Sequence, residues 1–596
     1  MNNYRTPLRD IDFTLFELFK YEQHCGAIGH ASVDRELTGA FLGEAARFAE
    51  EVLAPLGPVG DQQGCKLIDG NVVTPSGFKQ AYQQYCDAGW PTLSRSTAYG
   101  GQGLPQSLGV ILSEIIGTPN WAWGMYAGLS QGAMHTIEIH GTEQQKQQYL
   151  PALISGRWTG TMCLTEAHAG SDLGLLRTRA EPQPDGSYLI TGTKIFISSG
   201  DHDLAENIVH IVLARLPDAP AGTKGISLFV VPKIQLKDDG SLASVNGVSC
   251  SSLEDKMGIH GNATCVLQFE GAKGCLLGEV NKGLNHMFTF MNLARIGSGL
   301  QGLAHAEFGY QQARLYARER LQMRSLSGVK NTAGPADPII VHPDIRRMLL
   351  TQKSLVEGIR MLSYYASIKM DVSQHSTDAD ERQQAVDLLG LLTPIVKAFS
   401  TEAGFESANL ALQCLGGHGY IRDWGLEQNL RDCRIATLYE GTTGIQALDL
   451  LGRKVLGAGG KTLAPLIDEI TQLCRSCDDT EQLAAHAAQL ATLSEEWQQL
   501  SMHIARQAQQ NPDEIGAAAV DYLMCSGYLV VAFLWLKAQQ VALRQLAQPV
   551  ADPGFYRAKL AAAEFYFARI LPRTMGLIKA MESGADNLMS LASADF

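Results

Sequence analysis

The sequence predicts a multidomain α+β protein with a helical N-terminal domain, a middle antiparallel β domain, a helical bundle and an additional C-terminal helical domain. Three observations support this prediction. The chain has 596 residues, which at roughly 100–200 residues per domain suggests about three to five domains. Its residue pattern changes from helical to β-branched and back to helical. A glycine-rich segment over 457–461 then precedes a last helical stretch.

An N-terminal extension over residues 1–34 precedes the first predicted domain, residues 35–155. Polar and apolar residues alternate at helical period from Leu37 to Ala54, and residues 107–140 form a long apolar-rich helical region interrupted by glycines. A loop over 98–104 contains three glycines, which permit tight turns and a close approach of the backbone.

The second predicted domain, residues 156–275, has the pattern of a β domain. Segments 188–198, 208–214 and 226–232 are short, rich in β-branched residues and bounded by Gly, Pro and Asp, as expected for strands. Long amphipathic helices return over residues 280–455, the predicted bundle, with an irregular excursion at 325–338. Residues 461–596 are rich in Ala, Leu and Gln at helical period and form the predicted additional domain.

The overall composition excludes several classes of protein. With 48 Lys or Arg against 61 Asp or Glu, the net charge is −13, and an acidic chain repels the phosphates of nucleic acids. A chain that is 45% hydrophobic and 18% charged is too apolar to be disordered. The first residues lack the basic and apolar regions of a secretory signal, and the longest apolar stretch, 525–536, is too short to cross a bilayer. We therefore expect a cytoplasmic protein without integral membrane association.

Twelve cysteines occur singly, apart from Cys474 and Cys477. Scattered cysteines in a large chain without a signal predict reduced cytoplasmic thiols and no disulfide framework. This pair lies in a helical pattern, where positions i and i+3 share a face, so a metal or redox site is one interpretation. A structural zinc would need a second ligand pair at a suitable spacing, and we expect two small buried apolar residues and no metal.

Two long motifs make this order of domains specific. The first is Cys-Leu-Thr-Glu-Ala-His-Ala-Gly-Ser-Asp over 163–172. The second is Gln-Cys-Leu-Gly-Gly-His-Gly-Tyr over 413–420, followed by Arg-Asp-Cys-Arg over 431–434 and Tyr-Glu-Gly-Thr-Thr over 439–443. In this order and at this spacing they resemble the acyl-CoA dehydrogenase family of flavoproteins, over roughly residues 35–455. The resemblance implies FAD as cofactor, an acyl-CoA as substrate and a β-barrel-like middle domain.

The first motif has a physical interpretation as part of a flavin site. A flavin ring needs backbone and hydroxyl donors at its pyrimidine edge, because these stabilise the negative charge that arrives on reduction. The resemblance implies that Thr165 meets that edge and that Met162 and Leu164 line the same wall. It also implies that Ser171 lies near the pantetheine or phosphate arm of the CoA.

A second segment, residues 194–200, resembles the strand of the family that packs on the flavin ring. Its implied cofactor contacts are Phe196, Ile197 and Ser198. Phe196 and Ser198 stand at positions usually held by Trp and Thr, and both exchanges keep an aromatic face and a hydroxyl. The alternative is an ordinary β domain with a buried Phe and Ser.

Glu440 is the predicted catalyst. The α-proton of an acyl-CoA thioester is very weakly acidic, and a carboxylate that loses its hydration in a dry cavity becomes a stronger base because its pKa rises. The resemblance implies that Glu440 removes the α-proton while the β-hydrogen leaves as hydride to the flavin N5. It also implies that the Glu440 N–H and a flavin ribityl hydroxyl polarise the thioester carbonyl. Gly441 lets the backbone approach the substrate closely.

Some members of the family carry their base on an earlier helix, directly before a substrate-facing arginine. The matching pair here is Ala294-Arg295, and alanine cannot take a proton, which strengthens the assignment to Glu440. Arg295 and Asn292 lie about one helical turn apart on one face and resemble the contacts of the family to the CoA adenine. Asn292 stands where an Asp is more usual.

Contacts to FAD from a neighbouring subunit are also implied. Segment 316–322 resembles the one whose arginine, here Arg320, reaches the FAD pyrophosphate across a dimer interface. Arginine suits this role because it pairs with phosphate in a bidentate way. The family usually continues Phe-Gly after this segment, whereas this chain has Met323-Arg324. The other implied cofactor contacts are Gln322, Gln413, Gly416, Gly417 and Thr442.

His418 lies inside the second motif and has two interpretations. It can be a ligand or part of a proton relay, or it can be a variable position within the turn that ends a helix. We favour the second interpretation.

Both ends of the chain resemble one branch of the family. Simple members end soon after the helix over 449–456, whereas this chain adds a helical domain, and it opens with Tyr-Arg-Thr-Pro-Leu-Arg-Asp over 4–10. Both features resemble the enlarged bacterial branch that includes 3-methylmercaptopropionyl-CoA dehydrogenase and related long- and medium-chain enzymes. In that branch the added domain packs where a second dimer sits in tetrameric forms, so the resemblance implies a homodimer. The family implies electron-transferring flavoprotein as the electron acceptor.

The leading interpretation is therefore FAD-dependent oxidation of an acyl-CoA to the trans-2-enoyl-CoA in fatty-acid β-oxidation.

Several alternatives to this interpretation remain. A methylthiopropanoyl-CoA dehydrogenase differs in its acyl group. An acyl-CoA oxidase passes its electrons to oxygen, but residues 594–596 are not a peroxisomal targeting tripeptide. A DNA-associated flavoprotein needs a basic C-terminal region, whereas 461–596 carries ten Lys or Arg against fifteen Asp or Glu. A membrane-docked very-long-chain enzyme needs a basic flank that the apolar stretch 527–536 lacks. A non-catalytic flavin-bearing protein is the last alternative.

Overall fold

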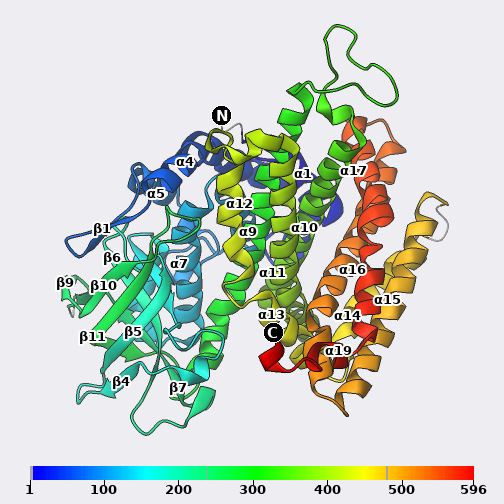
Figure 1. The fold of residues 1–596 in the computed structure, drawn as a ribbon. Helices are drawn as coiled ribbons and strands as arrows, with labels where there is room; N and C mark the ends of the chain where they lie inside the picture. Colours follow the sequence, from blue (N-terminus) through cyan, green and yellow to red (C-terminus); the bar gives the residue numbers. More distant parts are fainter. Residues whose placement is uncertain (1–3, 238, 478–480) are drawn as a thin grey trace. The chain divides into compact units, whose positions relative to one another are not determined.

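The computed structural model describes residues 4–237, 239–477 and 481–596, and its chain forms two units (Figure 1). Unit 1 comprises Met1–Gly43 and Ser298–Phe596, and unit 2 comprises Glu44–Gly297. Residues 1–3 of the predicted N-terminal extension, 238 of the predicted β domain and 478–480 of the predicted additional domain lie outside the described residues. The predicted fold class is confirmed, because helical, β and helical segments follow one another in the predicted order.

Unit 2 begins with helices and continues into strands. Its helices are the end of α3 (Arg35–Phe48), α4 (Ala54–Gln63), α5 (Phe78–Asp87), α6 (Gln106–Gly117), α7 (Trp121–His140), α8 (Glu143–Ile154) and the start of α9 (Gly283–Glu319). Its strands are β1 (Lys66–Ile68), β2 (Asn71–Val73), β3 (Trp158–Cys163), β4 (Arg179–Pro182), β5 (Tyr188–Ser198), β6 (Asn207–Arg215), β7 (Ile226–Pro232), β8 (Ile234–Leu236), β9 (Leu242–Val245), β10 (Val248–Leu253) and β11 (Thr264–Leu276).

The helical region predicted over 107–140 is two helices, α6 and α7. The break falls at Pro119-Asn120, because the Asn120 side chain accepts a hydrogen bond from the Trp123 N–H at 3.1 Å and caps α7. Helix α6 ends at Gly117, whereas the glycines at positions 109, 124, 128 and 132 lie inside the two helices.

Seven strands form the large sheet of unit 2, and five of them close into a ring. The ring runs β11, β5, β4, β6 and β7, because β7 pairs with both β6 and β11. Most pairs are antiparallel, as predicted, but β6 runs parallel to β3 and, at a single residue pair, to β4. A parallel pair needs a long connection, and the chain between β3 and β6 includes β4 and β5.

Strand β6 shows why a run of apolar residues, interrupted only by buried His210, forms a strand here. Val209, Ile211 and Leu213 pack in one hydrophobic core with residues of α7 and α8, whereas Val212 and Ala214 pack in a second core with residues of β5 and β11. Successive side chains of a strand point to opposite faces, so a strand that is buried on both faces carries apolar residues on both.

Within its described residues, every named element of unit 1 is a helix. Its helices are α1 (Leu8–Asp12), α2 (Tyr21–Ala27), the start of α3, most of α9, α10 (Pro343–His375), α11 (Ala379–Leu415), α12 (Leu426–Arg434), α13 (Thr443–Leu448), α14 (Ala464–Arg475), α15 (Glu481–Ala508), α16 (Asp513–Leu546), α17 (Pro553–Phe565), α18 (Arg573–Glu582) and α19 (Asp586–Met589). Figure 1 shows α10, α11 and α16 as long neighbouring helices, and contacts link each pair.

Helix α16 is the core of the additional domain. Within the residues that the structure describes, it alone is long and apolar enough to span a membrane, yet 78% of its most apolar window is buried inside the protein. Two glycines let it approach its neighbours closely. A Cβ on Gly527 would lie 2.2 Å from the ring of Phe399 in α11, and one on Gly358 of α10 would lie 2.5 Å from Val531. The stretch 525–536 is therefore part of a buried core helix.

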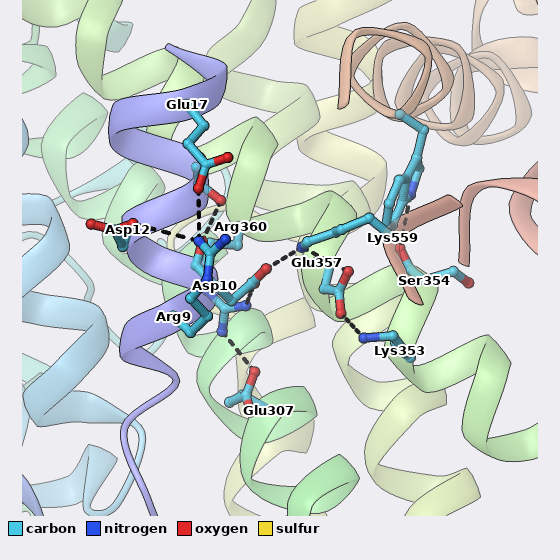
Figure 2. A network of polar contacts seen from close by, with 12 residues as sticks. Arg9, Asp10, Asp12, Glu17, Glu307, Lys353, Ser354, Glu357, Arg360 and Lys559 are labelled. Atoms are coloured by element: carbon cyan, nitrogen blue, oxygen red, sulfur yellow. Dashed lines mark hydrogen bonds and ion pairs between the residues drawn. The ribbon is translucent and has the colours of Figure 1, made fainter. Parts of the chain in front are cut away.

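A buried ion network joins the N-terminal segment to the bundle and to the additional domain (Figure 2). The carboxylate of Asp10 in α1 accepts hydrogen bonds from Arg360 of α10 and Lys559 of α17. Lys559 Nζ also lies 2.8 Å from a Glu357 carboxylate oxygen, and Arg360 Nη2 lies 2.6 Å from Glu307 Oε2. The side chains of Arg360 and Lys559 are each only 1% exposed, so these charges depend on one another.

The network is electrically balanced. Its three acids, Asp10, Glu307 and Glu357, face three cations, Arg360, Lys559 and Lys353, the last of which pairs with Glu357. Burial alone would raise the pKa of Asp10, but the cations outweigh that effect and hold this pKa well below its usual range. The carboxylate of Asp10 is therefore ionised at neutral pH.

Candidate functional site

The predicted base, Glu440, lies in unit 1 on the loop between α12 and α13. Its backbone is left-handed, with φ of 56°, and Gly441 follows with φ of 88°. A left-handed backbone is uncommon for a residue other than glycine, and it turns the chain sharply between the two helices. The Glu440 side chain is half-buried.

Hydrogen bonds to its carbonyls hold this loop in place. The Gly441 carbonyl accepts a hydrogen bond from Lys397 Nζ at 2.6 Å, and the Glu440 carbonyl accepts one from Gln446 Nε2 at 3.2 Å. Lys397 is fully buried in the middle of α11. A Cβ on Gly441 would lie 2.4 Å from Gln446 Nε2, so a side chain here would displace the Gln446 amide, and the left-handed φ of 88° favours glycine.

The flanks of the loop are anchored as well. Tyr439 donates a hydrogen bond to buried Gln301 of α9, whose Nε2 in turn donates to the Asp432 carbonyl at 3.1 Å. On the other side, Thr443 Oγ1 donates to Glu402 at 2.5 Å. The side chain of Thr442 caps α13 by accepting from the Ile445 N–H at 3.2 Å. The Glu440 carboxylate therefore lies on a loop that is held by hydrogen bonds from residues of α9, α11 and α13.

The second predicted cofactor segment of unit 1 lies at the end of α11. Gln413, Gly416 and Gly417 are exposed there. Gly416 adopts φ of 58° and ψ of −136°, and a Cβ on Gly416 or Gly417 would meet nothing within 4 Å. The turn thus presents bare backbone to its surroundings.

Arg320 and Gln322 are exposed at the end of α9, and the Arg320 Nη2 lies 3.4 Å from Gln322 Oε1. The excursion over 325–338 that follows is ordered around the Asp337 carboxylate. This carboxylate accepts the N–H groups of Ser325, Lys330 and Asn331 at 2.6–2.9 Å. Although burial raises it, the pKa of Asp337 lies well below its usual range because of these donors.

In unit 2, the first motif begins at the last residue of β3. Leu164 is buried in a hydrophobic core, and Met162 and Thr165 are half-buried. The Thr165 carbonyl accepts the Ile195 N–H at 2.9 Å, which joins the motif to β5. Ser171 is exposed on the loop beyond.

A buried ion pair beneath the motif was not singled out as functional by the sequence. Lys194 Nζ lies 2.9 Å from both Glu166 Oε1 and the Leu164 carbonyl, and Lys194 is fully buried. Burial raises the pKa of Glu166, but Lys194, the Thr178 hydroxyl and the Arg177 N–H lower it further, to about 2. The pair fixes residues 164–166 on the sheet.

Phe196 is the most unusual residue of β5. It is 59% exposed and adopts a left-handed backbone with φ of 58°. The register between β5 and β11 shifts at this point, because Ile197 pairs with Cys265 and Lys194 pairs with Leu267. One extra residue in β5 makes a bulge, so that the aromatic ring leaves the sheet core. Ile197 is only 2% exposed, so it offers its backbone and not its side chain to the predicted cofactor. Ser198 is half-buried.

The two predicted substrate residues on α9 lie together in unit 2. Arg295 Nη1 lies 3.3 Å from Asn292 Oδ1, and the guanidinium lies 5.6 Å from the centre of the Phe288 ring. Arg295 is 5% exposed, whereas Asn292 is exposed. The pair therefore presents an amide on the surface with a cation behind it.

His418 has a structural partner on each side. Its Nδ1 and the Tyr316 hydroxyl are 2.8 Å apart, and its ring stacks on that of Trp424. Cys474 and Cys477 are buried and form no disulfide. Over the described parts of the chain, no cluster of three His, Cys, Asp or Glu residues has a geometry suited to a metal ion.

The residues fit a flat cofactor with a phosphate arm. Unit 2 offers an exposed aromatic ring on a bulged strand beside a half-buried threonine, and stacked rings bind such faces. Unit 1 offers an exposed arginine and an open glycine backbone turn, both of which suit phosphate and close backbone contact. Each unit thus offers groups of a kind that suits one part of a flavin dinucleotide.

Four family models match the chain in succession. They are the acyl-CoA dehydrogenase N-terminal domain over residues 37–157, the middle domain over 161–272, the C-terminal domain over 281–456, and a domain described as acetyl-CoA dehydrogenase C-terminal like over 466–592.

Similar proteins of known activity match over nearly the whole length. The chain is 41% identical to 3-methylmercaptopropionyl-CoA dehydrogenase of Ruegeria pomeroyi over 577 residues, which cover 95% of this chain and 96% of that protein. It is 35% identical to the broad-specificity linear acyl-CoA dehydrogenase FadE5 of Mycobacterium tuberculosis over the full length of both chains. It is 34% identical to a butyryl-CoA dehydrogenase of Syntrophomonas wolfei, with 97% of each chain covered.

Solved structures share the fold. Caenorhabditis elegans ACDH-11, in complex with C11-CoA, matches with a TM-score of 0.77 at 19% identity, covering 99% of this chain and 95% of that one. An acyl-CoA dehydrogenase of Bacillus anthracis complexed with FAD matches with a TM-score of 0.75 at 20% identity, covering 92% and 89%.

Proposed function

This chain belongs to the acyl-CoA dehydrogenase family, and on that premise we propose that it oxidises an acyl-CoA to the trans-2-enoyl-CoA with Glu440 as the base. The cofactor is FAD. The observation that carries the assignment is the loop at 440, where Glu440 itself has a left-handed backbone and is followed by a glycine whose φ of 88° disfavours any side chain.

The side chain and the backbone of Glu440 have different roles in the reaction. The Glu440 carboxylate takes the α-proton, and its backbone N–H donates a hydrogen bond to the thioester carbonyl, which stabilises negative charge on that oxygen. Lys397 and Gln446 hold the carbonyls of Gly441 and Glu440, so the carboxylate and the N–H keep their relative orientation. When bound, FAD supplies the acceptor for the hydride that leaves the β-carbon.

Two groups of residues would hold FAD. In unit 2, Met162, Leu164 and Thr165 would line the flavin wall, and Phe196, Ile197 and Ser198 would meet the ring from β5. Arg320 and Gln322 would reach the pyrophosphate of the FAD in a neighbouring subunit, and Gln413, Gly416 and Gly417 would bind its adenosine side. Thr442 would add a hydroxyl contact, and Ser171, Asn292, Arg295 and Gly441 would contact the acyl-CoA.

The proposal includes two candidates for the acyl group of the substrate. The names of the full-length relatives include 3-methylmercaptopropionyl, butyryl and broad linear acyl groups. The 41% identity to the first of these favours a short thioether substrate, 3-(methylthio)propanoyl-CoA, as a second candidate beside unbranched fatty acyl-CoAs. We further propose that the protein is a cytoplasmic homodimer and that an electron-transferring flavoprotein takes its electrons.

Substitution of Glu440 tests the base. Glu440→Gln should stay yellow and bind acyl-CoA, yet reduce its flavin at least about 100-fold more slowly than wild type, because positioned general bases contribute about 10²–10⁴ in rate. The measurement is anaerobic stopped-flow bleaching near 450 nm. Glu582→Gln, at an exposed carboxylate, is the matched control and should bleach like wild type. Bleaching of Glu440→Gln at the wild-type rate would place the base elsewhere.

A substrate series separates the candidate activities. Acyl-CoAs of increasing chain length and 3-(methylthio)propanoyl-CoA are turned over anaerobically with ferrocenium and again with oxygen as sole acceptor. A dehydrogenase turns over with ferrocenium and hardly with oxygen, whereas equal turnover with oxygen would identify an oxidase. The highest kcat/KM identifies the acyl group.

A further inference from the structure

Three aromatic side chains of unit 1 form a compact cluster that the proposed chemistry does not use. His418 belongs to the turn after α11, Trp424 to the turn before α12, and Tyr316 to the last part of α9. The His418 and Trp424 rings are nearly parallel, at 25°, with centroids 5.1 Å apart. The Tyr316 ring is perpendicular to both, at centroid distances of 5.8 Å and 5.2 Å.

A hydrogen bond completes the cluster. The Tyr316 hydroxyl and His418 Nδ1 are 2.8 Å apart. Perpendicular and stacked rings at these distances attract one another beyond their buried area, and the hydrogen bond fixes how the tyrosine and histidine rings turn. The turn after α11 is thereby bound to the end of α9 by side chains rather than by a shared strand or helix.

The cluster lies between two segments that are proposed to bind FAD. Tyr316 precedes Arg320 by one helical turn, and the Arg320 N–H donates to the Tyr316 carbonyl at 2.8 Å, so both residues belong to one face of the helix end. His418 directly follows Gly416 and Gly417. The three rings thus join the two segments that are proposed to hold the same FAD, the one through its pyrophosphate and the other through its adenosine.

We infer that Tyr316, His418 and Trp424 are positioning residues for FAD, which set the spacing between the Arg320 guanidinium and the Gly416–Gly417 backbone. This inference rests on the proposed function, because that function names the ligand. Binding a flexible dinucleotide at two points is favourable only where those points are already at the right separation. The cluster supplies that separation before the cofactor arrives.

The two halves of the cofactor provide a selective test. FMN has the flavin ring and one phosphate but lacks the adenosine monophosphate half, so a change in the spacing between the pyrophosphate contact and the adenosine contact should affect FAD binding and leave FMN binding unchanged. We would remove flavin from the full-length protein and titrate it with FAD or FMN, following flavin fluorescence. A cluster that merely stabilises the fold would change both affinities alike.

The expected result is a loss confined to FAD. His418→Ala removes the stacking and the hydrogen bond and should raise the Kd for FAD about 10- to 100-fold, with the Kd for FMN within about twofold of wild type. Tyr316→Phe keeps the ring and removes only the hydrogen bond, so it should raise the Kd for FAD about 2- to 10-fold. His503→Ala, a half-buried histidine of α15, is the matched control and should change neither.

Other outcomes separate this inference from the proposed function. If wild type binds FAD and both cluster variants bind it equally well, the positioning role is wrong and the proposed function stands. Equal losses for FAD and FMN likewise overturn it, in favour of a structural role. A wild type that binds neither flavin overturns both. Should His418→Ala fail to fold, Tyr316→Phe and Trp424→Leu decide the same question.

Discussion

The buried ions of unit 1 join segments that are far apart in the sequence, whereas the buried ion pair of unit 2 joins near neighbours. Asp10 meets Arg360 and Lys559, which are 350 and 549 positions away. Glu166 meets Lys194, 28 positions away. The first network ties an N-terminal segment and an added domain to the bundle, and the second fixes one loop on a sheet.

The two arrangements also differ in what remains when one partner is lost. Asp10 neutralises two cations whose side chains are almost inaccessible to water. Glu166 keeps three other donors besides Lys194, namely the N–H groups of Arg177 and Thr178 and the Thr178 hydroxyl. A buried charge is costly only as far as it lacks partners, so the same kind of substitution should be more harmful in unit 1.

The largest effect is expected from Asp10→Ala. It leaves three cations, of which Arg360 and Lys559 are buried, facing two carboxylates. Removal of one partner from a buried ion pair costs about 3–5 kcal/mol of unfolding free energy. Urea unfolding followed by circular dichroism measures this. Asp12→Ala is the matched control, because Asp12 pairs with Arg35 on the surface and such pairs contribute at most about 1 kcal/mol.

A double variant shows whether charge imbalance is the cause. Asp10→Leu with Lys559→Met removes one acid and one base and leaves Arg360 with Glu307 and Lys353 with Glu357. Because apolar replacement of a whole buried pair is often close to neutral, this variant should regain at least about half of the stability that Asp10→Ala loses. An Asp10→Ala protein as stable as Asp12→Ala would contradict the comparison.

A smaller effect is expected from Lys194→Met. The Glu166 carboxylate retains its three other hydrogen-bond donors in this variant. The free energy of unfolding should therefore fall by only about 2–3 kcal/mol. The same variant also loses the bond to the Leu164 carbonyl, so FAD should dissociate faster. Lys273→Met, at a lysine whose side chain is 49% exposed, is the control. A loss equal to that of Asp10→Ala would show that the remaining donors do not compensate.

The sequence predicted the order of the domains and the strands at 188–198 and 226–232 because apolar periodicity and turn residues are local signals. The loop at Glu440 and both ions of the Glu166 pair also lie within its motif segments. The role of Lys397 could also have been predicted, because it is a single lysine in the apolar helical run of α11. A lysine in a buried helix needs a carbonyl or carboxylate partner.

Other features had no local signal. The charges of Arg360 and Lys559 have the same pattern as solvated charges on a helix face, and only the packing of α1 and α17 on α10 brings them to Asp10. The bulge at Phe196 depends on the register between β5 and β11, which periodicity along one strand does not define. Likewise, the sequence assigned His418 to a turn but could not show that Tyr316 and Trp424 contact it.

The smallest expected effect is a difference in pH dependence. The pKa of Glu166 is lowered from its ordinary 4.5 to about 2, so the unfolded state binds more protons between these values and the folded state loses stability as the pH falls. Between pH 6.5 and pH 4 this group should account for about 1 kcal/mol. Lys194→Met raises the folded pKa of Glu166 and so removes much of that dependence, whereas the Asp10 network titrates alike in both proteins. The stability gap between wild type and Lys194→Met should therefore narrow at pH 4 in urea unfolding, and a gap that stays constant or widens would show that Lys194 does not depress the pKa of Glu166.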